Sequence, residues 1–188
     1  MRLFVALDLP ADVRSRLAVW RDGLVAGRDD LRPVAEEALH VTLAFLGYRA
    51  EREAEAIAEA ISGPDVQERA TSPFLAAGEV VPVPPRRPRL FALDLVDPDG
   101  ACVRLQQAVS DALEAKRFYT PEKRPFWPHV TLARVKRNLR ADPLPADPPP
   151  LEPFRAVQLT LYRSTLRPQG AQYDALASRP LAEPDPAG

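Results

Sequence analysis

The two histidines of this chain occupy the same tetrapeptide. His40 opens H-V-T-L at residues 40–43, His129 opens H-V-T-L at residues 129–132, and there is no other histidine among the 188 residues. Imidazole titrates near neutral pH, so two histidines can serve one reaction as general acid and general base. In-line displacement at phosphorus needs one such group beside the attacking oxygen and one beside the leaving oxygen. The pair therefore predicts phosphoryl-transfer chemistry.

Each motif also holds a threonine two positions after its histidine. Side chains two residues apart on a strand share a face, so the hydroxyls of Thr42 and Thr131 could donate to the non-bridging oxygens of a phosphate. Strict alternation predicts a cleft face of His40, Thr42, Ala44, His129, Thr131 and Ala133, and a core face of Val41, Leu43, Phe45, Val130 and Leu132. The alternative, two ordinary half-buried strand histidines, requires two identical contexts to arise by chance.

Other chemistries have less support in the sequence. Cys102 is the single cysteine, and the chain has no C-x-x-C or Cys/His cluster of zinc spacing. There is no Walker A, G-x-G-x-x-G or G-x-S-x-G motif. We therefore expect neither a metal nor a cofactor. The lone cysteine and the lack of a leader or a membrane-spanning run predict a cytoplasmic protein that does not bind membranes.

The elements that must position these residues are arranged as an internal repeat. R-L-F-V-A-L-D-L-P at 2–10 recurs as R-L-F-A-L-D-L-V-D-P at 89–98, and an H-V-T-L follows each copy. The repeat spans approximately 2–47 and 89–135, which predicts one domain, 1–188, made of two intertwined lobes. Duplication suggests that the two histidines face each other across a central cleft.

Hydrophobic periodicity gives the secondary structure. Residues 2–9 alternate as a strand, and apolar stripes predict helices over 13–24 and 101–115. Residues 51–62 are rich in helix formers and stop at Gly63-Pro64, which predicts a further helix. Residues 143–153 are too rich in proline for a helix or a central strand, so we expect an extended surface connection. Strands outnumber helices without alternating strictly with them. The predicted class is α+β, with two antiparallel β-sheets facing the cleft and helices outside.

The charge is unevenly distributed. The chain has a formal net charge of −1, yet residues 116–140 hold eight basic side chains and one acidic side chain. Aromatic residues, among them Tyr119 and Trp127, are interleaved with these basic residues, as a stacking surface for exposed bases requires. RNA is thus the expected partner, although charge alone equally fits a solvated surface run balanced by acids elsewhere.

The paired motifs and their flanks resemble a known family. His40-Val41-Thr42-Leu43, His129-Val130-Thr131-Leu132, the opening R-L-F-V-A-L-D-L-P and the late L-T-L-Y-R-S-T-L are similar to the two-histidine (2H) phosphoesterase superfamily. Within it they are similar to the LigT-like RNA 2′,3′-cyclic phosphodiesterases of bacteria and archaea. The resemblance implies a two-lobed fold around a cleft. It also implies metal-independent opening of an RNA 2′,3′-cyclic phosphate to a 2′-phosphomonoester, and a reverse 2′-5′ RNA ligation.

The same resemblance implies a role for each site residue. His40 becomes the general acid on the departing 3′-oxygen, His129 the base that activates water, and Thr42 and Thr131 the phosphate ligands. Arg134 matches a family arginine that contacts the substrate. Strict alternation places it on the core side, so either the strand ends or bulges there, or the match does not carry over. Further candidate substrate-binding residues are Trp127, where family members often carry histidine, Tyr119 and Lys136.

Two other functions remain open on sequence grounds. One is a phosphodiesterase that acts on a small cyclic phosphate of the cyclised ADP-ribose type. The other is a non-catalytic module that binds RNA ends. The expected protein is a monomer without an obligate protein partner.

Overall fold

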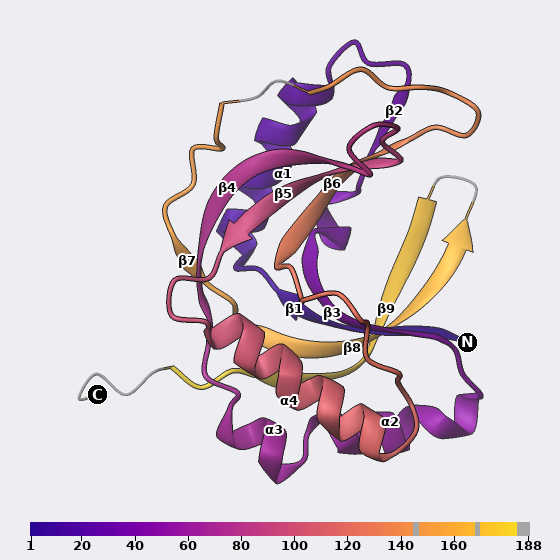
Figure 1. Cartoon of the computed structure of the whole chain (residues 1–188), viewed down its shortest axis with the longest axis vertical. Coiled ribbons are helices and arrows are strands. Elements are labelled where there is room, and N and C mark those ends of the chain that lie inside the picture. The colour runs from indigo at the N-terminus through magenta and orange to yellow at the C-terminus, as the bar shows by residue number, and fades with distance from the viewer. Residues whose placement is uncertain (145–146, 168–169, 184–188) are drawn as a thin grey trace.

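The computed structural model describes residues 1–144, 147–167 and 170–183. Its strands form one curled sheet of antiparallel ladders in the order β7-β4-β5-β6-β3-β1-β8-β9, with β2 paired to β6 (Figure 1). The strands are β1 (Arg2–Asp8), β2 (Leu31–Pro33), β3 (His40–Tyr48), β4 (Phe74–Val83), β5 (Leu90–Val96), β6 (His129–Val135), β7 (Phe154–Arg155), β8 (Gln158–Arg167) and β9 (Gly170–Pro180). The helices are α1 (Ala11–Val25), α2 (Ala54–Ile61), α3 (Pro64–Glu68) and α4 (Ala101–Ala115), with short 3-10 turns η1 (Glu36–Ala38) and η2 (Glu51–Glu53).

The two halves of the sheet meet at a narrow junction. Strands β3 and β6 are paired only through Val41 and Val130, whereas β1 pairs with β8 along its whole length. On one side of the junction lie β6, β5, β4, β7 and β2, and on the other lie β3, β1, β8 and β9. The α+β class and the two-lobed arrangement around a cleft are confirmed. The two expected sheets are joined at this one pair of valines.

Helix α4 packs on the half of the sheet that holds the first motif. Its buried residues include Cys102, Leu105, Val109 and Leu113, spaced to form one apolar stripe. They face α2, α3 and β3, all of which come from the first 68 residues of the chain (Figure 1). A helix that follows β5 therefore covers the lobe built around β1 and β3.

Helix α1 makes part of the reciprocal contact. It follows β1, and Leu24 and Val25 in its last turn pack against Leu31, Phe91 and Ala133 of the other lobe. Each half of the sheet is thus in contact with a helix that follows a strand of the other half.

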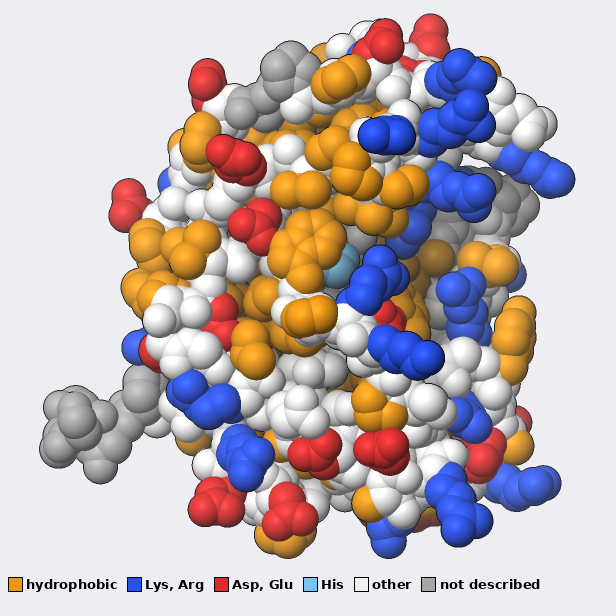
Figure 2. Space-filling view, in the orientation of Figure 1, with side chains coloured by type: hydrophobic (Ala, Val, Ile, Leu, Met, Phe, Trp, Pro, Cys, Tyr) orange, Lys and Arg blue, Asp and Glu red, His pale blue; other side chains and the backbone are white. Residues whose placement is uncertain are grey.

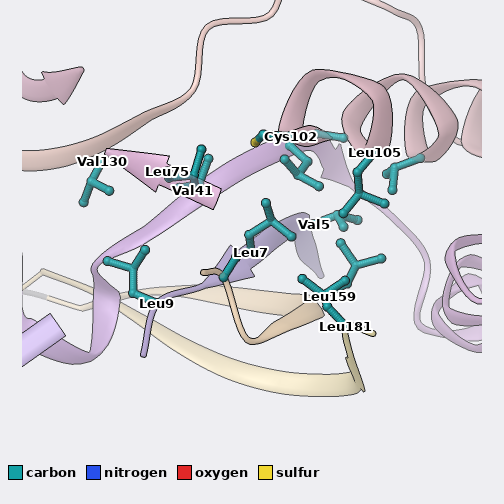
Figure 3. Close-up of a cluster of buried hydrophobic side chains, with 14 of the residues drawn as sticks. Val5, Leu7, Leu9, Val41, Leu75, Cys102, Leu105, Val130, Leu159 and Leu181 are labelled. Atoms are coloured by element: carbon teal, nitrogen blue, oxygen red, sulfur yellow. The ribbon is translucent and has the colours of Figure 1, made fainter. Parts of the chain in front are cut away.

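The main core lies between the sheet and these helices (Figure 3). Val5, Leu7 and Leu159 extend from β1 and β8 toward Leu105 of α4, and each is at most 1% exposed. Burying a leucine or valine side chain contributes about 1.5–3 kcal/mol. Strand β1 also buries its other face, because Phe4 is covered by aromatic side chains on the cleft side. The central strand is therefore held rigidly from both faces.

Some local expectations were incomplete. The helix predicted over 51–62 divides into η2 (Glu51–Glu53) and α2 (Ala54–Ile61), and a separate helix, α3, starts with Pro64 in its first turn. Within the proline-rich stretch, residues 145–146 lie outside the described residues, and the remainder of 143–153 has no helix or strand. Leu144 is nevertheless buried beside Phe91, so this connection is not confined to the surface.

None of the helices in the described part of the chain is long and apolar enough to cross a membrane.

Candidate active site

The four motif residues lie together on adjacent central strands. The antiparallel pair Val41 and Val130 points into the core, so the positions on either side of it point to the opposite, cleft-facing side. In that register His40 lies across from Thr131, and Thr42 across from His129. The histidines were expected to approach from opposite walls of a cleft. They instead extend from neighbouring strands into one concave surface.

An irregularity in β3 changes which residues face the cleft after Thr42. The pairing with β1 skips Leu43, because Ala6 pairs with Thr42 and Val5 with Ala44. A bulge of this kind rotates the residues that follow it. Ala44 is consequently buried, and Phe45 is 54% exposed and lines a cavity beside the site. The alternation predicted for these last two residues was wrong.

The same irregularity occurs in β6. The pairing with β5 skips Leu132, because Ala92 pairs with Thr131 and Phe91 with Ala133. Ala133 is fully buried, against expectation, and Arg134 is exposed and lines a second cavity. Strict alternation alone would place Arg134 on the core side, and of the alternatives left open by the sequence the bulge is the one the structure has.

His129 is held by the residue two positions before it. Its Nδ1 lies 2.7 Å from the carbonyl oxygen of Trp127, and the Trp127 ring stacks on the imidazole at 4.2 Å between centroids. The indole Nε1–H in turn donates to Asp94. Because a carbonyl oxygen can only accept a hydrogen bond, the proton of the neutral imidazole is assigned to Nδ1, and Nε2 keeps a free lone pair. Burial lowers the pKa of His129, while the Trp127 carbonyl and Asp94 oppose that shift.

His40 is enclosed more completely. Its Nε2 lies 3.0 Å from the hydroxyl oxygen of Thr42, and its ring stacks on Phe4 and meets the edge of Tyr173, with centroids 4.9 and 5.4 Å apart. Burial lowers the pKa of His40 from 6.5 to about 4, and the carboxylate of Asp8 and a backbone hydrogen bond at Ala38 oppose this. The free protein therefore holds His40 neutral at pH 7.

Each motif histidine has an aspartate directly opposite it on the adjacent strand. Asp8 pairs with His40 and Asp94 pairs with His129. Asp8 is 6% exposed and accepts hydrogen bonds from Gln158 (2.6 Å), Thr160 (2.8 Å) and Tyr162 (2.7 Å). Neither aspartate was singled out from the sequence. The signal was present, because both occupy the aspartate position of the repeated R-L-F segment.

A cavity of about 780 Å³ opens beside His129 and Thr42. Tyr119 and Trp127, two of the candidate substrate-binding residues, line it together with Arg124 and Phe45. Figure 2 shows a histidine in a hollow, with hydrophobic side chains on one side and Lys and Arg side chains on the other. The flat aromatic lining fits a nucleobase, which stacks on aromatic rings.

A second cavity, of about 590 Å³, lies near His40. Its lining includes Ala38 and Tyr173, both in contact with His40, and Arg32, Arg134 and Arg167. Lys136 lines neither cavity; it is exposed after the end of β6, with its backbone N–H bonded to Asp30. The structure thus brings seven of the eight predicted site residues to the two cavities or to the cleft-facing side of β3 and β6 between them.

Among the described residues, no group of three or more His, Cys, Asp and Glu side chains is arranged to hold a metal ion.

Comparisons with known proteins agree with this geometry. A family model described as the 2′-5′ RNA ligase superfamily matches residues 9–167. A protein of Escherichia coli named RNA 2′,3′-cyclic phosphodiesterase is 31% identical over 177 residues, 93% of each chain. Among solved structures, TT0787 of Thermus thermophilus superposes with a TM-score of 0.77 and 27% identity over 97% of this chain and 99% of that one. Escherichia coli LigT complexed with 3′-AMP gives 0.75 and 25% over 97% and 98%.

Proposed function

The chain belongs to the 2′-5′ RNA ligase superfamily, and we propose that it is an RNA 2′,3′-cyclic phosphodiesterase in which the two motif histidines transfer the protons. It is a hydrolase of phosphoric diesters, and the expected relation to the two-histidine phosphoesterases is confirmed. The observation that carries the proposal is the placement of His40, Thr42, His129 and Thr131 on one face between two cavities.

The reaction divides into two proton transfers at one phosphorus. A water oxygen attacks the phosphorus of the cyclic phosphate in line with the 3′-oxygen, so the new P–O bond forms as the P–O3′ bond breaks. His129 takes the proton of the water through Nε2, which its Nδ1 contact with Trp127 leaves free. His40 gives a proton to the departing 3′-oxygen. The product carries a 2′-phosphate and a 3′-hydroxyl, and solvent returns the proton from His129 to His40.

The threonines act on the charge of the phosphate. In the antiparallel register, Thr42 lies across from His129 and Thr131 across from His40, so a phosphate between the histidines lies within reach of both hydroxyls. Each hydroxyl can donate to a non-bridging oxygen and stabilise the charge that develops there. A 5′-hydroxyl in the position of the water would give the 2′-5′ ligation through the same two transfers.

RNA is preferred to a small cyclic phosphate because both cavities extend away from the histidines. One is lined by aromatic residues and the other by arginines, as a substrate with bases and successive phosphates requires. We further propose that the enzyme is a cytoplasmic monomer, since every group used in this mechanism comes from one chain and its single cysteine, Cys102, is buried.

The first prediction tests the reaction itself. A purified sample given a dinucleotide that ends in a 2′,3′-cyclic phosphate should convert it to the 2′-phosphomonoester, as followed by phosphorus NMR. Chelators should not change the rate, because side chains supply both proton transfers. A 3′-phosphate product would exclude the assigned leaving group. Loss of turnover in EDTA with recovery on one divalent metal would contradict the mechanism.

The second prediction concerns pH. The kcat/KM reports the free enzyme, in which burial holds the pKa of both histidines below 6.5, that of His40 at about 4. The enzyme form in which only one of the two histidines is protonated should therefore dominate below pH 6.5. For this reason kcat/KM should fall as the pH rises through neutrality. A bound phosphate anion favours imidazolium and raises both pKa values, so the bell-shaped kcat profile should lie at higher pH, around neutrality.

Initial rates over the acid and neutral range separate these two profiles. Asp8→Asn is the informative variant, because it removes a negative charge that raises the pKa of His40 and should move the acid limb of kcat/KM to lower pH. A kcat/KM that keeps rising above neutrality would contradict the prediction.

A further inference from the structure

Arg32 and Arg134 lie directly opposite each other on β2 and β6. Side chains in such a pair leave the same face of the sheet, with Cβ atoms about 5 Å apart. Both arginines are exposed and both line the second cavity. Neither belongs to an ion pair within the described residues, where the ion pairs are Arg21–Asp22, Arg28–Asp30 and Arg163–Asp174.

This arrangement places uncompensated positive charge at one place. Like charges directly opposite each other destabilise a sheet. Four arginines line this cavity, and one of them, Arg21, is paired with Asp22. Arg167, at the end of β8, joins Arg32 and Arg134 as the third that has no ion pair within the described residues, and the acidic side chain in the lining, Glu37, is not at ion-pair distance from any of the three. We call Arg32, Arg134 and Arg167 the arginine arm. An anion between its members would replace repulsion with hydrogen-bonded attraction.

The arginine arm begins beside the surface that carries the four motif residues. Tyr173, which lines the cavity, meets the ring of His40 edge-on, and Ala38, also in the lining, lies two residues before His40 in the chain. The aromatic cavity begins instead at His129 and Thr42. A ligand held between the histidines therefore has an aromatic cavity on one side and the arginine arm on the other.

We propose that the arginine arm binds the phosphodiester on the 5′ side of the terminal nucleotide of the RNA, while the base of that nucleotide occupies the aromatic cavity. This rests on the proposed function. The chemistry matches on both sides: bases stack on aromatic rings, and a guanidinium forms paired hydrogen bonds with phosphate oxygens. A mononucleotide lacks this phosphodiester, so the arm acts only on substrates of two or more nucleotides.

The third prediction is a change in length preference. In Arg32→Ala the ratio of kcat/KM for a dinucleotide to that for a mononucleotide, both ending in a 2′,3′-cyclic phosphate, should fall about tenfold. Arg52→Ala is the matched control, because Arg52 is an exposed arginine of η2 that lines neither cavity. Its ratio should equal that of the unmodified protein. An unchanged ratio in Arg32→Ala would overturn the proposal.

A neutral linkage locates the contact on the substrate. Replacing the phosphodiester of the dinucleotide with a methylphosphonate should cost the unmodified protein about as much as Arg32→Ala does. The same replacement should cost the Arg32→Ala variant little more, because the charge it would meet is already gone. Full additivity of the two changes would show that Arg32 acts elsewhere and would overturn the assignment.

A binding measurement keeps the arm separate from the reaction. Fluorescence anisotropy of a labelled trinucleotide with a 2′-phosphate needs no turnover. In Arg32→Ala the slope of log affinity against log salt should become shallower by about 0.7 for each phosphate that the variant no longer neutralises. If the protein fails to open the cyclic phosphate but shows this change, the proposed function is wrong and the arm stands. If it turns over and the slope is unchanged, the arm is wrong.

Discussion

Alanine in place of either His40 or His129 should lower kcat by about 10²- to 10⁴-fold, because each change removes one of the two proton transfers. The double variant should be little slower than the slower single variant, since the pair acts as one unit. Single-turnover rates with a cyclic-phosphate dinucleotide measure the three effects. Single variants that each keep more than a tenth of the rate, or a double variant that shows the full product of the two losses, would contradict a shared mechanism.

The division of roles has its own measurement. A substrate with sulfur at the 3′ bridging position has a leaving group that departs without a proton, because thiolates are far weaker bases than alkoxides. This substrate should restore most of the rate to His40→Ala and little to His129→Ala. Rescue of His129→Ala alone would mean that the acid and the base are exchanged.

The packing around His40 calls for a folding control. Its ring stacks on Phe4 and meets Tyr173, so alanine leaves a space among aromatic side chains. His40→Gln fills more of that space and still cannot act as a general acid. Both variants should therefore lose the reaction to the same degree, while their thermal unfolding temperatures differ. A glutamine variant with native activity would show that His40 serves only packing.

Alanine at Asp8 should lower the free energy of unfolding by about 2 to 4 kcal/mol. The carboxylate accepts hydrogen bonds from Gln158, Thr160 and Tyr162, and Thr160 is completely buried. Removing the acceptor deprives Gln158 and Tyr162 of this hydrogen bond and leaves Thr160 only its contact with the Ser178 hydroxyl, 3.1 Å away. Urea denaturation followed at constant m-value measures the loss.

Asp94→Ala is the matched control for this prediction. Asp94 holds the corresponding place opposite His129, but it is only half-buried and accepts one side-chain hydrogen bond, from Trp127. Its replacement should cost about 1 kcal/mol. Equal losses at the two aspartates would show that the buried hydrogen bonds of Asp8 are not the cause.

Sequence alone predicted the chemistry at His40 and His129 because two identical motifs and two similar strands leave few interpretations. It failed at Phe45 and left the direction of Arg134 open, since alternation along one strand cannot reveal a residue that the neighbouring strand skips. The register that skips Leu43 and Leu132 is a property of paired strands.

The distribution of charge along the sequence predicted only some of the basic residues that line the cavities. Lys136 lies in the most basic segment, yet it lines neither cavity. Arg32 lies outside that segment and is brought to Arg134 only by the pairing of β2 with β6. The location of a charge in space depends on which strands become neighbours, and local patterns do not contain that information.

Helix α4 follows β5 but packs on the half of the sheet built around β1 and β3, and this affects how the chain can fold during synthesis. The surface of α2, α3 and β3 that α4 covers is made before residue 68, and α4 itself is completed only at residue 115. Strand β1 lacks its partner on one edge for even longer, because that partner, β8, begins only at Gln158. A nascent chain therefore carries uncovered apolar surface at least until β8, which begins at Gln158, has left the ribosome. Because each lobe is completed by elements made much later, we expect both lobes to become stable together rather than one after the other during synthesis.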